Sequence, residues 1–252
     1  MGPARRALAQ HRSLGAAAHR PWPLPSGSWV IGQSWNELLF AHWPLDADAA
    51  RRLVPAPLEP DLFDGCAFVG VVPFRMQTVR FAWCPPVVGT SSFAEINVRT
   101  YVTHGGRPGI FFLSLDVNNL VALEIGRRAF GLPYLRAGVS LRTAGESVRF
   151  RSARVGRRAA FAAEYEPTGP PRAAVPGSLE HWLTERYCFY TLAGGRPARR
   201  TEVHHAPWPL QPAAAEVTES SLLEACGIDV SSAPLLHFSR SQDVVAWPPC
   251  AC

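Results

Sequence analysis

Apolar and polar residues alternate along much of the chain, with the two-residue period of a β-strand that buries one face. The clearest case is Phe93–His104. Its apolar positions are Ala94, Ile96, Val98, Thr100 and Val102, and its polar positions are Glu95, Asn97, Arg99 and Tyr101. One face of this strand is therefore predicted to pack on a core, while the other carries residue types that can do chemistry.

A turn and a partner strand follow directly. Residues 105–109 contain three glycines and a proline, so residues 110–117 are predicted to return as the second strand of a β-hairpin. The register of this hairpin stays open. A slip of one residue exchanges Ser114 and Asp116 for Leu113 and Leu115 on a given face.

The rest of the chain predicts more strands and a few helices. Asp46, Asn118 and Ser178 have the side chains of helix N-caps, and Gly131 is the stop signal of the longest expected helix, at residues 118–130. Further strands are expected at residues 29–40, 66–76, 138–154, 159–166, 187–192, 215–219 and 235–247. This order of elements predicts a barrel or a sandwich rather than a parallel α/β sheet.

Residues 1–27 differ from the rest in carrying four arginines, no acidic residue and no alternating pattern. We expect a disordered basic leader, followed by a single domain over residues 28–252. An organellar transit peptide is the alternative interpretation of the leader. Outside it, 21 arginines face 20 acidic residues. The body is thus nearly neutral, and its charge does not predict nucleic-acid binding, which needs clustered basic residues on a folded surface.

Other function classes find no support in the motifs. The longest apolar runs are far shorter than the roughly 20 residues that span a bilayer, so we expect no membrane segment. The six cysteines form no CxxC pair, and the adjacent His204 and His205 would point to opposite faces of a strand, so we expect no metal and no other cofactor. Cys250 and Cys252 fit a frayed tail, and free thiols fit a reducing cytoplasm.

Several short motifs occur in a recognisable order along the chain. They are Phe40-Ala41-His42-Trp43-Pro44, Phe93-x-Glu95-x-Asn97-Val98-Arg99-Thr100-Tyr101-Val102, Phe111-Phe112-x-Ser114-Leu115-Asp116, Leu132-Pro133-Tyr134, Ser178-Leu179-Glu180, Glu185-Arg186-Tyr187 and His205-Ala206-Pro207-Trp208. Together, from about residue 35 to about residue 212, they resemble the YqjF-like proteins of unknown function, within the acetoacetate decarboxylase-like superfamily. The resemblance implies a mostly β (α+β) fold, an antiparallel β-barrel with an internal cavity and a few flanking helices.

The chain lacks the residue on which the decarboxylases of that superfamily depend. In those enzymes a Gly-aromatic-Pro-Lys-Lys segment carries the lysine that forms a Schiff base with the substrate. The matching segment here is Gly131-Leu132-Pro133-Tyr134-Leu135, and all 25 basic residues of the chain are arginine. A guanidinium stays protonated and offers no free amine lone pair. We therefore expect no Schiff-base chemistry.

The polar face of Phe93–His104 is the candidate site. We expect Glu95 as acid or base and Arg99 as a clamp for a carboxylate or enolate, the two catalytic candidates. The substrate-binding candidates are Asn97, Tyr101, Tyr134 and Asp116. The alternative is a solvent-facing strand with an internal salt bridge. Glu185-Arg186-Tyr187 is interpreted as a structural ion pair at a helix end.

Two classes of function are compatible with these residues. The first is a barrel that binds a small carboxylate or carbonyl compound, as an enzyme without a Schiff base or as a binding protein. The second is a non-catalytic binding or scaffold protein whose barrel is filled by side chains. A cavity of roughly several hundred Å³ with converging polar groups would favour the first class. The sequence leaves open whether the chain is an enzyme and whether it forms a homo-oligomer.

Overall fold

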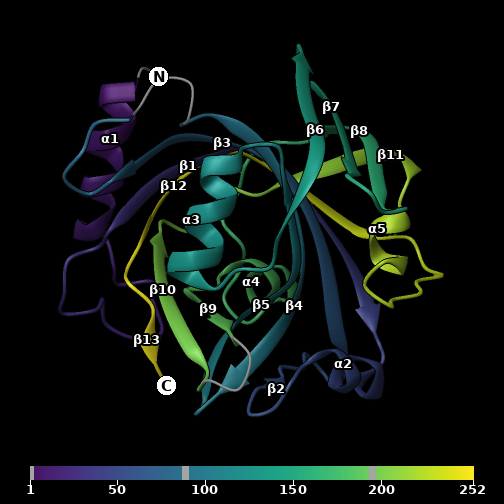
Figure 1. Cartoon of the computed structure of the whole chain (residues 1–252), viewed down its shortest axis with the longest axis horizontal. Coiled ribbons are helices and arrows are strands. Elements are labelled where there is room, and N and C mark those ends of the chain that lie inside the picture. The colour runs from purple at the N-terminus through teal and green to yellow at the C-terminus, as the bar shows by residue number, and fades with distance from the viewer. Residues whose placement is uncertain (1–2, 87–90, 193–196) are drawn as a thin grey trace.

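The computed structural model describes residues 3–86, 91–192 and 197–252. Within these residues, thirteen strands form one continuous sheet that curls around itself (Figure 1). The strands are β1 (Ile31–Leu45), β2 (Glu59–Pro60), β3 (Ala67–Phe81), β4 (Phe93–His104), β5 (Arg107–Val117), β6 (Tyr134–Ala144), β7 (Ser147–Arg154), β8 (Ala160–Pro167), β9 (Cys188–Thr191), β10 (Arg199–His205), β11 (Gln211–Glu219), β12 (Leu235–Ala246) and β13 (Cys250–Ala251). The helices are α1 (Pro3–Arg12), α2 (Ala47–Leu53), α3 (Leu120–Phe130), α4 (Leu179–Thr184) and α5 (Ser221–Glu224). The prediction of a mostly β fold is confirmed.

Two extra pairings close the sheet into a ring. β5 pairs with β4 as well as β6, and β10 pairs with β12 as well as β9. The strands β1, β3, β4, β5, β9, β10 and β12 therefore form a closed circuit of hydrogen-bonded neighbours. The strands β6, β7, β8 and β11 continue the sheet beside this ring, and the two-residue strands β2 and β13 pair with β4 and β10.

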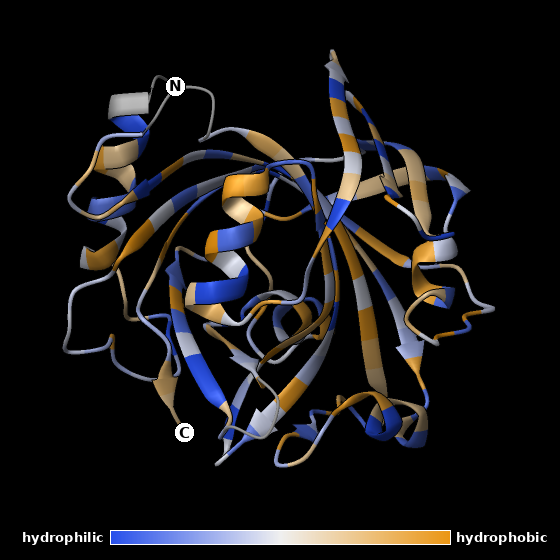
Figure 2. Cartoon of the chain, in the orientation of Figure 1, coloured by the Kyte–Doolittle hydropathy of each residue, from blue (hydrophilic) through white to orange (hydrophobic). Residues whose placement is uncertain are grey.

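The two faces of the ring strands meet different surroundings, and Figure 2 shows orange and blue bands alternating along several of them. The apolar side chains of β4, such as Ile96 and Val98, belong to the main hydrophobic core, together with Val148 and Phe150 of β7. The polar side chains Glu95, Asn97 and Arg99 line the inside of the ring instead. The predicted two-faced character of this strand is confirmed.

The helix ends follow the capping chemistry that the sequence predicted, with one shift. Asp46 and Ser178 cap α2 and α4 through their side chains, and Gly131 ends α3 in the left-handed conformation with a φ of 69°. The cap of α3 is Asn119, which accepts from the backbone N–H groups of Val121 and Ala122, rather than Asn118. Two adjacent asparagines offer the same capping oxygen, so sequence alone could not choose between them.

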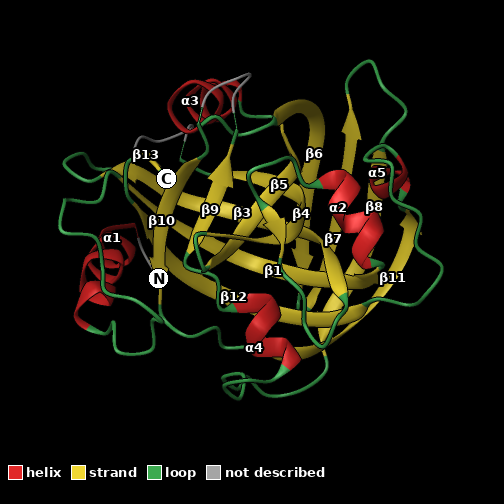
Figure 3. Cartoon of the chain, turned by 90° about the horizontal axis from the view of Figure 1, so that it is seen from below, coloured by secondary structure: helices red, strands yellow, loops and turns green. Residues whose placement is uncertain are grey.

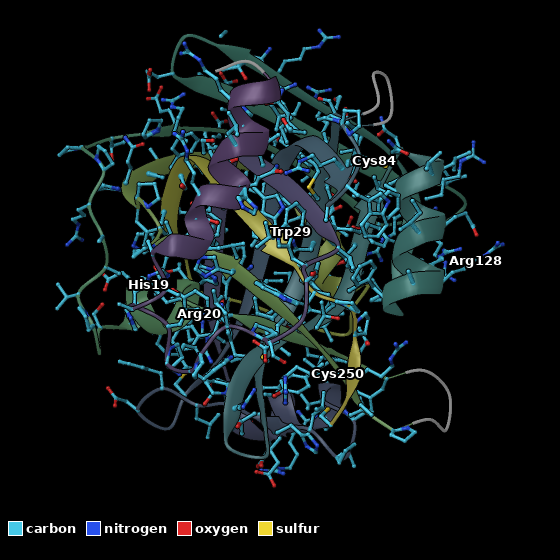
Figure 4. All side chains as sticks on the ribbon, turned by 90° about the vertical axis from the view of Figure 1, so that its left-hand side faces the viewer. His19, Arg20, Trp29, Cys84, Arg128 and Cys250 are labelled. Atoms are coloured by element: carbon cyan, nitrogen blue, oxygen red, sulfur yellow. The ribbon has the colours of Figure 1, made fainter. Side chains whose placement is uncertain are left out.

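The structure corrects the expectation of a disordered leader. Pro3–Arg12 forms α1, which lies beside β1 and β12 (Figure 4, purple helix). Gln10 is fully buried, its amide donates to Ser34 and to the Thr78 carbonyl, and its oxygen accepts from Arg80. A Cβ on Gly32 would lie 2.4 Å from the Gln10 oxygen, so the strand makes room for it. Polar side chains anchor the helix, which is why an apolar pattern did not reveal it.

The chain after α1 is anchored by a second polar contact. Arg20 forms a buried ion pair with Glu202 at 3.0 Å, and its guanidinium lies 4.7 Å from the ring centre of Tyr187. We expect Arg20→Ala to lower the free energy of unfolding by about 3 kcal/mol, because it leaves part of the Glu202 charge uncompensated in a buried setting. Urea denaturation measures this, and Arg12→Ala on the exposed face of α1 is the control. Equal stability of both variants would show that the leader is dispensable.

The C-terminal end also differs from the prediction. Cys250–Ala251 forms β13, which pairs with Arg199 and Arg200 of β10, so the expected frayed tail is wrong for these residues. All six cysteines are free thiols. Among the described residues, no helix is long and apolar enough to cross a membrane.

Candidate functional site

A cavity of about 360 Å³ lies inside the ring of strands. Figures 1 and 3 place α3 over one opening of the ring and α4 toward the opposite end. Ile125 and Gly126 of α3 line the cavity at the first end, and Thr184 and Arg186 come from the other. Most of the wall is apolar and aromatic, including Trp35, Leu38, Phe74, Met76, Phe93, Phe112, Phe189 and Trp208. The side-chain-filled barrel that the sequence left open is therefore not the arrangement of this protein.

Glu95 and Tyr134 form a buried hydrogen-bonded pair at the α3 end. The Tyr134 hydroxyl donates to Glu95 Oε2 at 2.7 Å, and both residues line the cavity. Burial raises the pKa of Glu95 to about 7, the nearby charge of Asp116 adds to this, and the Tyr134 hydrogen bond opposes it. Glu95 can thus give and take a proton near neutral pH, as a general acid or base must.

Gly126 makes the position of Tyr134 possible. A Cβ at Gly126 would lie 2.3 Å from Cε2 and 2.5 Å from Cδ2 of the Tyr134 ring. Real Cβ atoms cannot approach a ring so closely, so any larger residue at this helix position displaces the tyrosine. Because Gly126 has no side chain, the Tyr134 ring can pack directly against α3, in the position that brings its hydroxyl to Glu95.

We expect Gly126→Ala to destabilise the protein by about 1–3 kcal/mol, because overpacking outweighs the roughly 1 kcal/mol that alanine gains over glycine in a helix. In a Tyr134→Ala background the same change should stabilise, since the clash is gone. Urea denaturation of the four proteins of this double-mutant cycle gives the coupling. Additive effects of the two substitutions would contradict the close contact.

Arg99 is buried and has no anionic partner among the described residues. It is 6% exposed and lines the cavity, and its Nε has no hydrogen-bond partner. Its guanidinium instead lies 5.2 Å from the ring centre of Phe40 and 5.9 Å from that of Tyr101. Such rings stabilise a desolvated cation by about 2 kcal/mol or more, but a buried guanidinium normally also pairs with an anion.

Other polar atoms of the cavity-lining residues are also unpaired. Asn97 Oδ1, Trp208 Nε1 and Arg186 Nη2 are buried and have no hydrogen-bond partner within the described part of the chain. Buried polar groups are seldom left unpaired in folded proteins. Together with Arg99, four of the ten buried unpaired atoms of the described residues belong to this lining, as expected of a site that a polar ligand completes.

The structure places four of the six predicted residues together and separates two. Glu95, Asn97, Arg99 and Tyr134 line the cavity, whereas Tyr101 and Asp116 do not. The Tyr101 hydroxyl lies 2.7 Å from His42 Nε2 and donates to the Leu183 carbonyl at 2.9 Å, which gives it structural partners.

Asp116 belongs to a different network. Its carboxylate accepts from Arg154 Nε at 2.9 Å, with both side chains almost fully buried, and Arg154 also donates to Ser114. In the β4–β5 pairing Asp116 lies opposite Ile96, and paired residues share a face, so Asp116 points toward the core side. The structure thus separates Asp116 from the four predicted residues that line the cavity.

The two catalytic candidates, Glu95 and Arg99, are on the same face of β4. Both line the cavity, but no ion pair joins them among the described residues, and the Arg99 guanidinium lies beside Tyr101, on the side away from Glu95. The acid and the cation occupy different parts of one wall.

Arg186 lines the cavity although sequence reasoning assigned it only a structural role. It does form an ion pair, with Asp61 at 2.5 Å, but its guanidinium also lies 5.0 Å from the centre of the Tyr101 ring, which the Arg99 guanidinium approaches as well. The sequence did contain a signal for this role, because Arg186 stands in Glu185-Arg186-Tyr187, one of the motifs that carry the family resemblance.

Within the described residues, no group of three or more His, Cys, Asp or Glu side chains could hold a metal ion.

Comparisons with known proteins agree with this geometry. The model of the DUF2071 family, described as an uncharacterized conserved protein, matches residues 32–243. The chain belongs to this family. An uncharacterized protein of Bacillus subtilis (strain 168), YqjF, is 41% identical over 227 residues, covering 89% of this chain and 93% of the relative.

Solved structures similar to this member of the DUF2071 family share its fold at low identity. Acetoacetate decarboxylase from Legionella pneumophila has a TM-score of 0.63 at 14% identity, and the match covers 94% of this chain and 93% of the enzyme. MppR, an enduracididine biosynthesis enzyme complexed with the condensation product of pyruvate and imidazole 4-carboxaldehyde, has a TM-score of 0.64 at 15% identity, covering 89% and 90%. The acetoacetate decarboxylase-like fold that the sequence predicted is confirmed.

Proposed function

We propose that this protein binds an organic carboxylate that also carries a carbonyl or hydroxyl group in the barrel cavity. The observation that carries the proposal is the Arg99 guanidinium, buried in the cavity wall with no anion beside it among the described residues. A ligand carboxylate supplies the missing charge through bidentate hydrogen bonds. Fold neighbours such as MppR, which has been solved with pyruvate bound, support a small organic ligand in such a barrel.

Glu95 and Tyr134 give the site its chemistry. Protonated Glu95 donates a hydrogen bond to a ligand carbonyl oxygen, and ionised Glu95 takes a proton from a carbon next to that carbonyl. Tyr134 stands 2.7 Å from Glu95 and holds its carboxyl group in place. No Schiff base takes part, because the chain contains no lysine and arginine cannot replace one. The reaction class is therefore proton transfer beside a carbonyl, without a covalent intermediate on lysine.

Arg99→Met separates binding from stability. Methionine keeps much of the volume of arginine and removes a buried charge, so the free energy of unfolding should fall by no more than about 1 kcal/mol, or rise. In a thermal-shift screen of oxo and hydroxy carboxylates, the wild type should gain about 2.7 kcal/mol at a hundredfold excess over the dissociation constant. Arg99→Met should lose this gain, while the surface variant Arg149→Met keeps it.

Proton transfer is tested by hydrogen–deuterium exchange of the ligand. In deuterated water, the wild type should exchange the protons next to the carbonyl of a bound ligand for deuterium, and NMR follows this exchange. The Glu95→Gln variant should abolish it. A screen in which no carboxylate binds, or in which Arg99→Met binds as well as the wild type, would overturn the proposed function.

A further inference from the structure

The polar groups of the cavity lie along one strand, and their spacing limits the ligand. Glu95, Asn97 and Arg99 occupy alternate positions of β4, so the Cα atoms of Glu95 and Arg99 are about 13 Å apart at roughly 3.3 Å per residue. Asn97 lies midway, and its Oδ1 has no partner among the described residues. The strand thus presents three polar positions in a row.

The two outer positions belong to opposite ends of the cavity. Glu95 accepts a hydrogen bond from Tyr134, whose ring packs against Gly126 of α3. Arg99 instead shares the ring of Tyr101 with Arg186, which comes from the chain after α4. Figure 3 shows α3 and α4 at opposite ends of the ring of strands. The proton-transfer pair and the two guanidiniums are therefore separated along the length of the cavity.

The space between these ends is apolar and large. The volume of about 360 Å³ falls in the range of pockets that enclose drug-sized ligands, roughly 300–1,000 Å³. Phe112 and Leu115 of β5 and Phe74 and Met76 of β3 face this space. A three- or four-carbon oxo acid would leave most of the apolar wall in contact with water. In such an acid the carboxylate and carbonyl are also close together, so it could not reach Arg99 and Glu95 together.

We infer that the ligand is an elongated carboxylate with an apolar body and a second polar group, a hydroxyl or carbonyl, at its far end. The carboxylate binds Arg99, the body lies along β4, and the far group meets Glu95 and Tyr134. An extended chain advances about 1.2 Å per bond, so roughly eight to ten bonds separate the two ends. This inference rests on the proposed function and narrows it to a substrate class.

Isothermal titration with straight-chain probes tests the length. Butanoate, hexanoate, octanoate, decanoate and dodecanoate should show up to about a fourfold gain in affinity per methylene, the equivalent of about 0.8 kcal/mol, with a plateau near ten carbons. 10-Hydroxydecanoate should bind at least fivefold more tightly than decanoate, because its hydroxyl reaches the Glu95–Tyr134 pair.

Three variants test which residues bind each end of the ligand. Tyr134→Phe, which keeps its ring beside Gly126, and Glu95→Leu should remove the preference for 10-hydroxydecanoate and leave decanoate binding unchanged. Arg99→Met should make decanoate bind no better than 1-decanol. In the wild type, decanoate should exceed 1-decanol by at least tenfold.

The outcomes separate this inference from the proposed function. If affinity peaks at three to five carbons and 4-oxopentanoate depends on Arg99, the elongated ligand is wrong and the proposed function stands. If 1-decanol binds as tightly as decanoate in the wild type, or if no carboxylate of any length binds, the anion site itself is wrong and both proposals fail.

Discussion

Replacing Arg154 by alanine is expected to lower the free energy of unfolding by about 3–5 kcal/mol, the usual cost of removing one partner of a buried ion pair. Arg154 and Asp116 are 2.9 Å apart, and their side chains are 4% and 1% exposed. Burial raises the pKa of Asp116, and the Arg154 hydrogen bonds and charge oppose that rise. Without Arg154, nothing offsets the effect of burial on Asp116. Its carboxylate then either stays charged, at a high cost in free energy, or takes up a proton.

The same strand offers a matched control. Arg149, also on β7, pairs with Glu164 at 2.8 Å, but both side chains are exposed. Arg149→Ala should cost less than about 1 kcal/mol, as for other surface ion pairs. The double variant Arg154→Met with Asp116→Asn should recover most of the loss, because no charge remains buried. Urea denaturation of the four proteins measures these differences, and equal losses for Arg149→Ala and Arg154→Ala would contradict the buried network.

The alternation of β4 carried most of what the sequence could predict about the site. It placed Glu95, Asn97 and Arg99 on one face, and the structure puts that face inside the ring. Alternation fixes only the face, however, and not what the partner strand presents to it. The β4–β5 register shifts between Val98 and Arg99, so that Arg99 lies opposite Phe112 and Asp116 lies opposite Ile96. An irregularity of this kind has no signature in the pattern of either strand, and the register was open for that reason.

Contacts between distant segments explain the remaining errors. Tyr101 continues the polar face of β4, but its hydroxyl is hydrogen-bonded to the Leu183 carbonyl in α4 and to His42 on β1. The basic leader resembles a disordered segment in composition, yet it forms α1 and buries Gln10 against β1. Gly126 and Tyr134 are eight residues apart in the sequence, and only the turn at the end of α3 brings them together. Such contacts depend on how the elements pack against one another, which the local sequence pattern does not encode.

Replacing Glu95 by glutamine is expected to stabilise the protein at alkaline pH and to leave its stability unchanged in acid. The glutamine side-chain oxygen accepts the Tyr134 hydrogen bond as the carboxylate does, so packing is preserved. The pKa of Glu95 is raised from 4.5 to about 7 in the folded protein, mainly because burial disfavours the charged form. This difference corresponds to about 3 kcal/mol at about 1.4 kcal/mol per pKa unit.

The direction of the effect follows from proton linkage. Between pH 4.5 and 7 the folded protein keeps the Glu95 proton that the unfolded chain releases, so wild-type stability falls as the pH rises through this window. Below pH 4.5 both states are protonated and the penalty is absent; above pH 7 it is complete. Glutamine does not titrate. The stability advantage of Glu95→Gln should therefore be near zero at pH 4.5 and reach about 3 kcal/mol at pH 8.

Urea denaturation from pH 4.5 to 8.5, with an unchanged m-value, measures this curve. Glu164→Gln is the control, because that carboxylate is exposed and hydrogen bonds from Arg149 and Ser147 lower its pKa, so its replacement should bring no gain at pH 8. A Glu95→Gln variant that is less stable than the wild type across the whole range would mean that Glu95 is held as a stabilised carboxylate. In that case Glu95 would be charged at neutral pH and could not donate a proton to a ligand. Both the proposed acid role and the argument that burial raises the pKa of Glu95 would then be wrong.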